Sequence, residues 1–234
     1  AVAAYVQSIA EFPSDESVLR VARLDGPIPA DPDDALWQRV REIRLALSAQ
    51  ATFRPRLQNP AVSQVKVRAL YNADEIAFRI EYADRTESRI RADTGASDTQ
   101  GTWPELDVEQ FEHTRKKYAD AAALEFPEIP PKDAERPHFL YGDRAHPVYL
   151  MRFDAADTAA AELNARGFDK LARQMPEEQH ITGAARFDDG RWIIIMKRKL
   201  RGGKKDTPFE PSAAPLPFAV LVWDGGNGET GLRH

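Results

Sequence analysis

The chain contains no cysteine among its 234 residues. The lack of thiols excludes disulfide bonds, cysteine-ligated zinc, iron–sulfur clusters held by this chain, and the thioether bonds that attach c-type haem. It does not distinguish a reducing from an oxidising compartment. Any cofactor must therefore be held without a covalent bond, by His, Met, Lys, Tyr or carboxylate side chains.

Long apolar runs and an excess of positive charge are also missing. No segment approaches the ~18 consecutive apolar residues of a membrane span. A formal net charge of -5 lacks the basic footprint of nucleic-acid binding. We therefore expect no membrane span and no nucleic-acid partner. Residues Ala1–Tyr5 have neither an initiator methionine nor a basic segment followed by an apolar one, and we expect a processed N-terminal end, such as signal cleavage leaves.

Signatures of hydrolases and nucleotide-binding proteins are absent. The five histidines show neither HExxH nor i,i+4 spacing, and there is no GxSxG elbow or P-loop. The glycines of 225–228 follow a predicted strand but open no helix, so they are no phosphate cradle. These absences argue against a stand-alone hydrolase.

Alternation of apolar and polar residues predicts a series of short strands. The clearest are two hairpins, 65–71 with 76–82 and 183–187 with 191–200, the second across an Asp188-Asp189-Gly190 turn. Further strands are predicted at 42–49, 120–127, 138–141, 148–153 and 218–223.

Helices are predicted at 35–40, behind the cap Asp31–Asp34, at 107–119, and at 154–166, where alanines precede Gly167 as the C-cap. The polar segments 84–101 and 202–206 are predicted loops. The pattern indicates a mainly β protein, an antiparallel β-sandwich with a few helices inserted in loops. We expect residues 34–234 to form this domain and 1–33 to be an N-terminal extension.

Two side chains stand out as candidate ligands. An apolar strand and a glycine-dense turn in Val220–His234 lead directly to the last residue, His234. Met151 shares one face of the 148–153 strand with Tyr149 and Phe153. Both have ordinary interpretations, because a terminal histidine can be a disordered end and a methionine among aromatics can fill a core. The residues alone indicate a β-rich domain with a candidate His/Met site.

Five sequence blocks carry a family resemblance. They are Asp34–Trp37; Val67–Asn72 with Glu75–Phe78; Asp120–Pro127 (family DAVAVQFP); Phe139–Asp143 with Pro147–Phe153 (family FFMG…PVNIWRW); and Phe218–Glu229 (family FAVWDGSNGERGGKK). In this order they resemble the γ subunits of the ethylbenzene dehydrogenase, dimethyl sulfide dehydrogenase, selenate reductase and chlorate reductase group. The matches extend over about Asp34 to His234.

That resemblance implies a β-sandwich that holds one haem b, with a methionine and a lysine as axial ligands. In the family, this subunit passes electrons between the iron–sulfur subunit of a periplasmic molybdenum enzyme and an external carrier. The resemblance thus implies that the chain is not an enzyme by itself. The resemblance therefore implies a periplasmic heterotrimer with a molybdenum-containing catalytic subunit and an iron–sulfur subunit. A c-type cytochrome or a similar protein would be the external acceptor.

The sequence departs from the family at both ligand positions. Arg233 and His234 lie where the family has lysine. Arginine stays protonated and cannot ligate, so we predict His234 as one ligand. The family's methionine falls on Tyr141, while Met151 falls on a family tryptophan. We predict Met151 as the second ligand, with Tyr141 as the alternative, because a tyrosinate would lower the potential and suit an electron relay poorly.

The other predicted cofactor contacts are apolar walls and partners for the propionates. The walls are Phe126, Leu140, Tyr149, Phe153 and Trp223, and the cationic partners are Arg152 and Arg233. A rival interpretation is a cofactor-free β-sandwich that binds carbohydrate or a protein partner. Trp103, Tyr118 and Trp192 would then line its groove.

Overall fold

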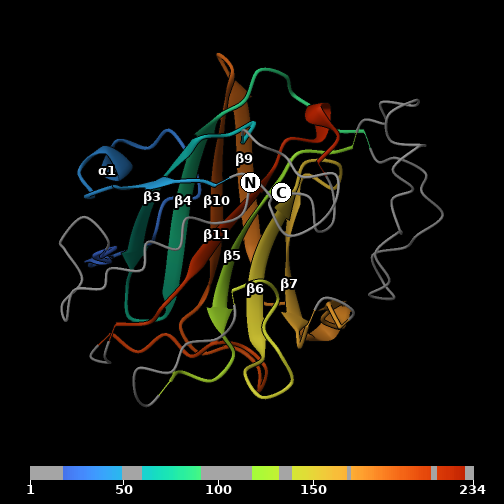
Figure 1. Ribbon diagram of the computed structural model, residues 1–234. Coiled ribbons are helices and arrows are strands. Elements are labelled where there is room, and N and C mark those ends of the chain that lie inside the picture. Colours follow the sequence, from blue (N-terminus) through green and yellow to red (C-terminus); the bar gives the residue numbers. More distant parts are fainter. Residues whose placement is uncertain are drawn as a thin grey trace.

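The computed structural model describes residues 18–48, 60–90, 118–131, 139–167, 170–211 and 215–229. These residues form two stacked β-sheets (Figure 1), which confirms the predicted β-sandwich. The first sheet contains, in hydrogen-bonded order, β1 (Ala22–Arg23), β3 (Gln64–Tyr71), β4 (Glu75–Ala83), β10 (Arg191–Lys199) and β9 (Thr182–Asp188), with β2 (Ile43–Ala46) also paired to β3. The second contains β11 (Ala219–Trp223), β5 (Ala121–Pro127), β6 (Val148–Asp154), β7 (Ala159–Ala165) and β8 (Ala172–Arg173).

The two predicted hairpins are confirmed and supply the centre of the six-stranded sheet. In the β3–β4 hairpin, Val65 pairs with Tyr82 and Tyr71 with Ile76. The turn between them closes because Asn72 Oδ1 accepts hydrogen bonds from the backbone N–H groups of Asp74 (2.9 Å) and Glu75 (2.8 Å). β9 and β10 pair across the predicted Asp188–Gly190 turn.

Within the described ranges, the helices are short: α1 (Ala35–Gln38) and the 3₁₀ turns η3 (Pro176–Glu178) and η4 (Gly225–Asn227). The predicted cap of α1 is confirmed, since Asp34 Oδ1 accepts from Leu36 N at 2.8 Å. Trp37 on α1 is fully buried. None of the helices in the described ranges is long and apolar enough to cross a membrane.

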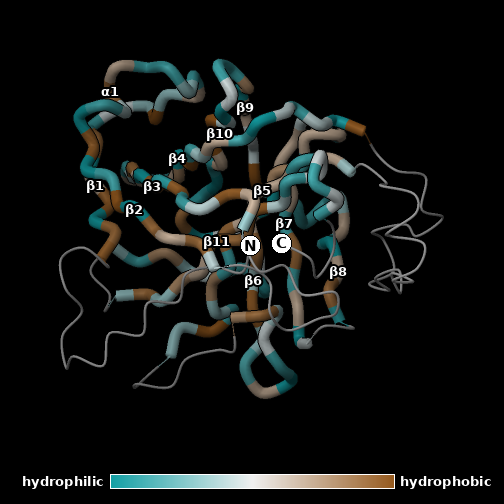
Figure 2. The backbone as a smooth tube through the Cα atoms, turned by 45° about the horizontal axis from the view of Figure 1, so that its top comes forward, coloured by the Kyte–Doolittle hydropathy of each residue, from teal (hydrophilic) through white to brown (hydrophobic). Residues whose placement is uncertain are grey.

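The main core lies between the two sheets. It contains the inward-facing residues of every long strand, among them Ile80 of β4, Leu124 of β5 and Ile194 of β10. Figure 2 shows apolar stretches, in brown, in the strands of both sheets. Every residue of β5 and β11 is buried, because apolar clusters lie on both faces of these strands. A second apolar cluster covers the outer face of the five-stranded sheet, and a third packs α1 against the outer face of the six-stranded sheet.

The helix predicted at 154–166 is wrong. A turn at residues 155–158, with Thr158 at φ 50°, reverses the chain, and β7 then pairs antiparallel with β6 from Ala159 to Ala165. Alanine is the best intrinsic helix former, but this preference is small per residue, and the pairing of all seven residues of β7 with β6 outweighs it. Alternating burial was the missed signal, because Leu163 and Ala165 lie on one face and Glu162 on the other.

The strand predicted at 138–141 is also wrong for its described part. Residues 139–141 form a turn, in which Tyr141 (φ 67°) and Gly142 (φ 62°) both adopt left-handed backbone conformations that cannot continue a strand. Of the helix predicted at 107–119, residues 107–117 lie outside the described residues, and 118–119 are irregular. Residues 84–90 and 202–206 are irregular, as expected; 91–101 lie outside the described residues.

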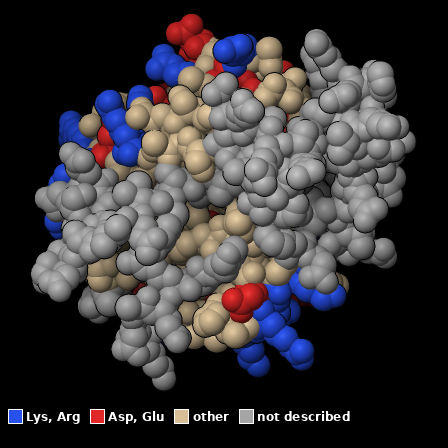
Figure 3. All heavy atoms as spheres, in the orientation of Figure 1, with Lys and Arg blue, Asp and Glu red and all other residues tan. Residues whose placement is uncertain are grey.

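Charged residues of both signs share the visible surface. On the face drawn in Figure 3, Lys and Arg gather at the upper left and lower margins, with Asp and Glu beside them. The described surface in this view thus carries no extended basic face, in line with the net charge of -5. The proposed boundary at residue 33 stays a prediction, although β1 and the buried Ile28 pack within the same fold.

Candidate functional site

The predicted cofactor contacts divide between the two faces of the five-stranded sheet. Four of them face the other sheet and belong to the inter-sheet core: Phe126, Tyr149, Met151 and Phe153. Tyr141 and Trp223 belong to the separate apolar cluster on the outer face. Successive side chains of a strand point to opposite faces, so one flat macrocycle cannot lie against both groups. The predicted contacts therefore cannot all belong to one cofactor site.

The inner group is tightly packed. The Phe126 ring lies 5.6 Å from Phe78 of the opposite sheet, 5.1 Å from Phe209 and 5.8 Å from Phe218, measured between centroids. Met151 is fully buried in the same core cluster. Its sulfur lies in the interior of the sandwich, where a ligated metal would also have to lie.

A buried polar network borders the inner group. Tyr149 Oη donates to Glu162 Oε1 at 2.6 Å, and the Arg198 guanidinium lies 4.9 Å from the Tyr149 ring centroid. Arg198 Nε is 3.9 Å from Glu162 Oε1, and Glu162 also accepts from His180 N. Burial raises the pKa of Tyr149 well above its usual value. Tyr149 is therefore a neutral donor held in place, and sequence reasoning missed its partner because a helix was predicted there.

The outer group lies in a broad apolar surface, here named the outer-face cluster. Its buried members are Ala121, Ala123, Tyr141, Val148, Leu150, Leu163, Ala165, Leu171, Leu221 and Trp223. Within the described ranges, these residues come only from strands of this sheet and from turns beside it. Three of them are alanines, which contribute only methyl groups. The cluster thus forms an apolar floor on the outer face of the sheet, and all of its members are buried.

One carboxyl group is buried in this floor. Glu125 follows Ala123 on the same face of β5, and its side chain is fully buried. Tyr141 N donates weakly to Oε2 at 3.5 Å, while Oε1 has no hydrogen-bond partner among the described residues. Burial raises the pKa of Glu125 to about 8, against the small lowering by the Tyr141 hydrogen bond. A glutamate inside the apolar run Ala121–Phe126 was a visible signal that sequence reasoning did not use.

The turn at Tyr141 aims this side chain into the outer-face cluster. Tyr141 is almost fully buried, and its carbonyl accepts from Gly167 N at 2.8 Å. At Gly142, a Cβ atom would lie 2.5 Å from His146 O, so only glycine fits there. Leu140, one residue earlier, is half-buried. The tight turn fixes the position of Tyr141 beside Glu125.

Arg152 lies at the edge of the same face. Its guanidinium is 5.2 Å from the Trp223 ring centroid, and Nη2 is 3.1 Å from Asp154 Oδ2. Its side chain is partly exposed. Trp223 and Arg152 are thus brought together as the sequence suggested, with the cation at the margin of an apolar surface.

The glycine-rich C-terminal turn is compact. Asp224 Oδ1 accepts from Asn227 N at 2.9 Å, and Asp224 N donates to Glu229 Oε2 at 2.9 Å. Gly228 ends η4 in the left-handed conformation at φ 77°. Arg233 and His234 lie outside the described residues, so their predicted roles stay predictions.

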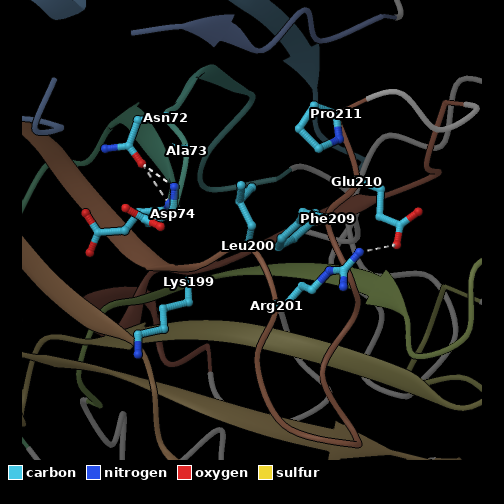
Figure 4. Close-up of a pocket in the computed structure, with 10 residues that line it drawn as sticks. Asn72, Ala73, Asp74, Lys199, Leu200, Arg201, Phe209, Glu210 and Pro211 are labelled. Atoms are coloured by element: carbon cyan, nitrogen blue, oxygen red, sulfur yellow. Dashed lines mark hydrogen bonds and ion pairs between the residues drawn. The ribbon is translucent and has the colours of Figure 1, made fainter. Parts of the chain in front are cut away.

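A separate open pocket lies at the end of the six-stranded sheet (Figure 4). It has a volume of about 760 Å³ and is lined by Asn72, Ala73, Asp74, Glu75, Lys199, Leu200, Arg201, Phe209, Glu210 and Pro211. Arg201 Nη2 and Glu210 Oε1 are 3.5 Å apart across it. None of the predicted cofactor contacts lines this pocket.

The rival groove is not formed by the residues predicted for it. Trp192 is fully buried between the sheets, 5.8 Å from Phe153 and 5.4 Å from Phe187 between ring centroids. Tyr118 is buried as well, and Trp103 lies outside the described residues. The two described aromatic residues therefore belong to the interior and not to a ligand-binding surface.

Three curated proteins are similar to nearly the whole chain. The respiratory nitrate reductase heme subunit ORF7 of Haloferax mediterranei is 22% identical over 205 residues, which are 88% of this chain and 64% of that protein. Dimethylsulfide dehydrogenase subunit gamma of Rhodovulum sulfidophilum is 26% identical, over 86% of this chain and 69% of that protein. Chlorate reductase subunit gamma of Ideonella dechloratans is 23% identical, over 93% and 80%. The chain spans just under two thirds of the length of the Haloferax protein.

Solved structures are more distant. A family 9 carbohydrate-binding module from Caldicellulosiruptor kristjanssonii in complex with glucose aligns with a TM-score of 0.42 and 9% identity, over 88% of this chain and 77% of that chain. A likeness of this degree supports no inference about ligands. The family model described as ethylbenzene dehydrogenase matches residues 34–169. Since that match covers more than half of the chain, the protein belongs to the ethylbenzene dehydrogenase family.

Proposed function

We propose that the protein is a non-catalytic electron-transfer subunit that carries one haem b. The relatives named as a heme subunit and as gamma subunits support this function. The absence of cysteine agrees with a haem held only by axial ligands and packing. With both axial positions filled, such a haem supplies reversible one-electron transfer and no substrate site at iron.

The outer-face cluster is the surface that we propose for the macrocycle. A single observation supports this location: the cluster is a buried apolar floor to which no described strand of the other sheet contributes. The unpartnered Oε1 of Glu125 beneath it is a buried polar atom that a bound group can approach. The inner face offers no comparable surface, since Phe78, Phe126 and Phe209 fill the space between the sheets.

The side chains of this face would then have separate roles. Tyr141, Leu150 and Trp223 exclude water from the macrocycle, which limits solvent access and so tunes the potential. Arg152 at the margin is placed to pair with a propionate, which would add to its ion pair with Asp154. Phe126, Tyr149 and Phe153 support the sheet from behind instead of contacting the cofactor.

For the second axial ligand, the sequence and the structure favour different residues. His234 is the proposed imidazole ligand. The resemblance puts the family's methionine at Tyr141, which lies on the outer face, whereas the sequence-based choice, Met151, lies on the inner face. Met151 as the ligand would require a haem between the sheets; Tyr141 would require one on the outer face.

A variant series with visible spectra tests this proposal. The full chain expressed with haem is expected to show a Soret band and a b-type spectrum on reduction. We expect His234→Ala to change the spin state or lose haem, with at least a tenfold loss of haem affinity. With haem on the outer face, Tyr141→Phe changes the spectrum or the potential, and Met151→Leu leaves both unchanged.

The outcomes separate function from location. If only Met151→Leu changes the spectrum or the potential, the haem lies on the inner face, and the proposed electron-transfer function still holds. A folded protein that stays colourless during titration with haemin would refute the haem proposal and favour the cofactor-free binding module.

The partners follow from the same proposal. We propose a heterotrimer in the periplasm, with a molybdenum-containing catalytic subunit and an iron–sulfur subunit, and a c-type cytochrome or similar acceptor outside it. Co-purification of a tagged chain with molybdenum and iron in fixed ratio would support this assembly. Isolation as a haem protein without partners from its native cells would contradict it.

A further inference from the structure

Three aspartates meet at one end of the sandwich. Asp84 directly follows β4, Asp120 directly precedes β5 and Asp224 directly follows β11. One carboxylate oxygen of each lies within 4.8 Å of one oxygen of both others. All three residues are buried, at 5%, 0% and 9% exposure. We call this group the triple-aspartate cluster; none of its members is among the residues predicted to contact haem.

Two buried polar atoms at the cluster have no hydrogen-bond partner among the described residues. One is Asp84 Oδ2, although Asp84 Oδ1 accepts from Thr86 N at 3.0 Å. The other is the hydroxyl of Tyr82, a residue of β4 that is only 2% exposed. Burial raises the pKa of Tyr82 first, and the negative charges of Asp120, Asp84 and Asp224 raise it further. The Tyr82 hydroxyl is therefore close enough to the cluster to be affected by its negative charges. A group bound at the cluster could supply the hydrogen-bond partner that this hydroxyl lacks.

Asp120 is held rigidly for ligation. Its Oδ2 accepts from Ser88 N at 2.7 Å and from Trp192 Nε1 at 3.0 Å, and its Oδ1 accepts from Gly225 N at 2.9 Å. An ionised carboxylate has about four lone-pair sites, so these three bonds leave room for one more contact. Gly225 is required here, because a Cβ atom would lie 2.1 Å from Tyr118 O.

The charges of the cluster are poorly balanced by the protein. Burial raises the pKa of Asp84 to about 7 and that of Asp120 to about 6, and neighbouring carboxylates add to both shifts. Burial also raises the pKa of Asp224, which the charge of Arg85 partly offsets, and that of Glu229 nearby. Three buried carboxylates without a cation between them are costly unless some are protonated.

We propose that the triple-aspartate cluster is a binding site for one Ca²⁺ ion. Calcium takes carboxylate oxygens at roughly 2.3–2.6 Å, so two ligands on opposite sides of one ion are up to about 5 Å apart. The separations in the cluster fit this limit. A water on the ion would supply the partner that Tyr82 lacks.

Such an ion would join the two sheets. Asp84 extends from the six-stranded sheet, while Asp120 and Asp224 extend from the five-stranded sheet. It would also anchor the glycine-rich turn that Asp224 opens. The calcium site is independent of the haem, because it uses none of the residues proposed to hold the haem.

Terbium luminescence tests the site on the full chain, since Tb³⁺ replaces Ca²⁺ and emits when a nearby tryptophan is excited. Trp192 is hydrogen-bonded to Asp120, which puts an efficient donor at the site. After EDTA treatment, we expect emission that saturates at one ion per chain. Ca²⁺ should displace the Tb³⁺, and Mg²⁺ should need at least about tenfold higher concentration because it demands shorter, octahedral contacts.

Asp84→Asn is the decisive variant, because it keeps the shape of the side chain and removes one charge. It should weaken Tb³⁺ and Ca²⁺ binding at least about tenfold. Saturating Ca²⁺ should raise the Tm of the wild type by about 4 °C or more and leave that of the variant unchanged. In EDTA, the variant should unfold at or above the wild-type Tm, since it relieves repulsion. Asp224→Asn is the second variant if Asp84→Asn does not fold.

Asp189→Asn is the matched control, because Asp189 lies in an exposed turn with 86% of its side chain accessible. It should bind Tb³⁺ as the wild type does. A wild type without sensitised emission and with the same Tm in Ca²⁺ and EDTA would overturn the proposal, and so would Asp84→Asn binding with unchanged affinity.

Discussion

Glu81 forms ion pairs with several basic side chains on the outer face of the six-stranded sheet. It lies on the outer face of β4, where its oxygens are 2.9 Å from Lys66 Nζ, 2.8 Å from Arg79 Nη1 and 3.8 Å from Arg68 Nη1. Arg68 and Arg79 are direct cross-strand neighbours of the same sign, and Arg79 is only 2% exposed. Like charges in this position repel, so the carboxylate between them is needed.

The pKa of Glu81 makes this role measurable. Burial alone would raise its pKa, but hydrogen bonds from Lys66 and Arg79 outweigh burial and lower it to about 2. The ionised form stabilises the fold above pH ~4.5, and this contribution is lost as the pH falls from about 4.5 to about 2. Because the network is partly solvated, we expect Glu81→Gln to cost about 2 kcal/mol at pH 7 and nearly nothing below pH ~2. Urea unfolding across this pH range measures the difference.

Glu75→Gln on the same strand is the control. Glu75 pairs with Lys197 at 3.2 Å, but its side chain is one-third exposed. Such surface pairs contribute less than about 1 kcal/mol. Equal losses in both variants would contradict the special role of Glu81.

At the scale of elements, the contact between β7 and β9 sets the distance between the sheets at one edge. Gly183 of β9 faces Ala160 of β7 so closely that a Cβ atom on Gly183 would lie 2.7 Å from Ala160 Cβ and 3.0 Å from Ala160 N. The two strands belong to different sheets. A side chain at 183 would therefore push the sheets apart.

We expect Gly183→Ala to lower the free energy of unfolding by about 1–3 kcal/mol, the usual cost of overpacking. Adding Ala160→Gly removes the clashing methyl group and should recover part of this loss. Chemical denaturation of the single and double variants measures both effects. A double variant that is less stable than Gly183→Ala would show that the contact is not the cause.

At the scale of the whole molecule, aromatic rings join the two sheets. Phe78 of β4 contacts Phe126 of β5 at 5.6 Å and Phe209 at 5.7 Å between centroids. Phe209 belongs to the segment that follows β10, so rings from three distant parts of the chain meet here. The ring contacts provide stabilisation beyond the burial of apolar area.

A double-mutant cycle tests this link. Phe78→Leu and Phe126→Leu should each destabilise the protein by about 1–3 kcal/mol, because each leaves unfilled volume in the core. Their coupling energy should be about 0.5–1.5 kcal/mol. Additive losses within experimental error would mean that the two rings pack without a specific interaction. If the haem lies on the outer face, its spectrum should stay unchanged in Phe126→Leu.

The sequence alone determined the two hairpins of the six-stranded sheet. Period-two burial and turn residues such as Asn72 and Asp188–Gly190 act over a few neighbours, so β3, β4, β9 and β10 could be assigned with their turns. The family blocks likewise led to the family that the comparisons show. Local preference failed at β7, because alanine is compatible with a strand once β6 and β8 pair with it.

Only the tertiary structure decided which side chains share a site. It separated Met151 from Tyr141 by a sheet, placed the Glu125 carboxyl in an apolar floor, and brought together Asp84, Asp120 and Asp224. Asp120 and the Gly225 N–H that it accepts from are 105 residues apart. Such juxtapositions depend on which strands pair and on which face of each strand is buried. The spacing of residues along the sequence specifies neither the pairing nor the buried face.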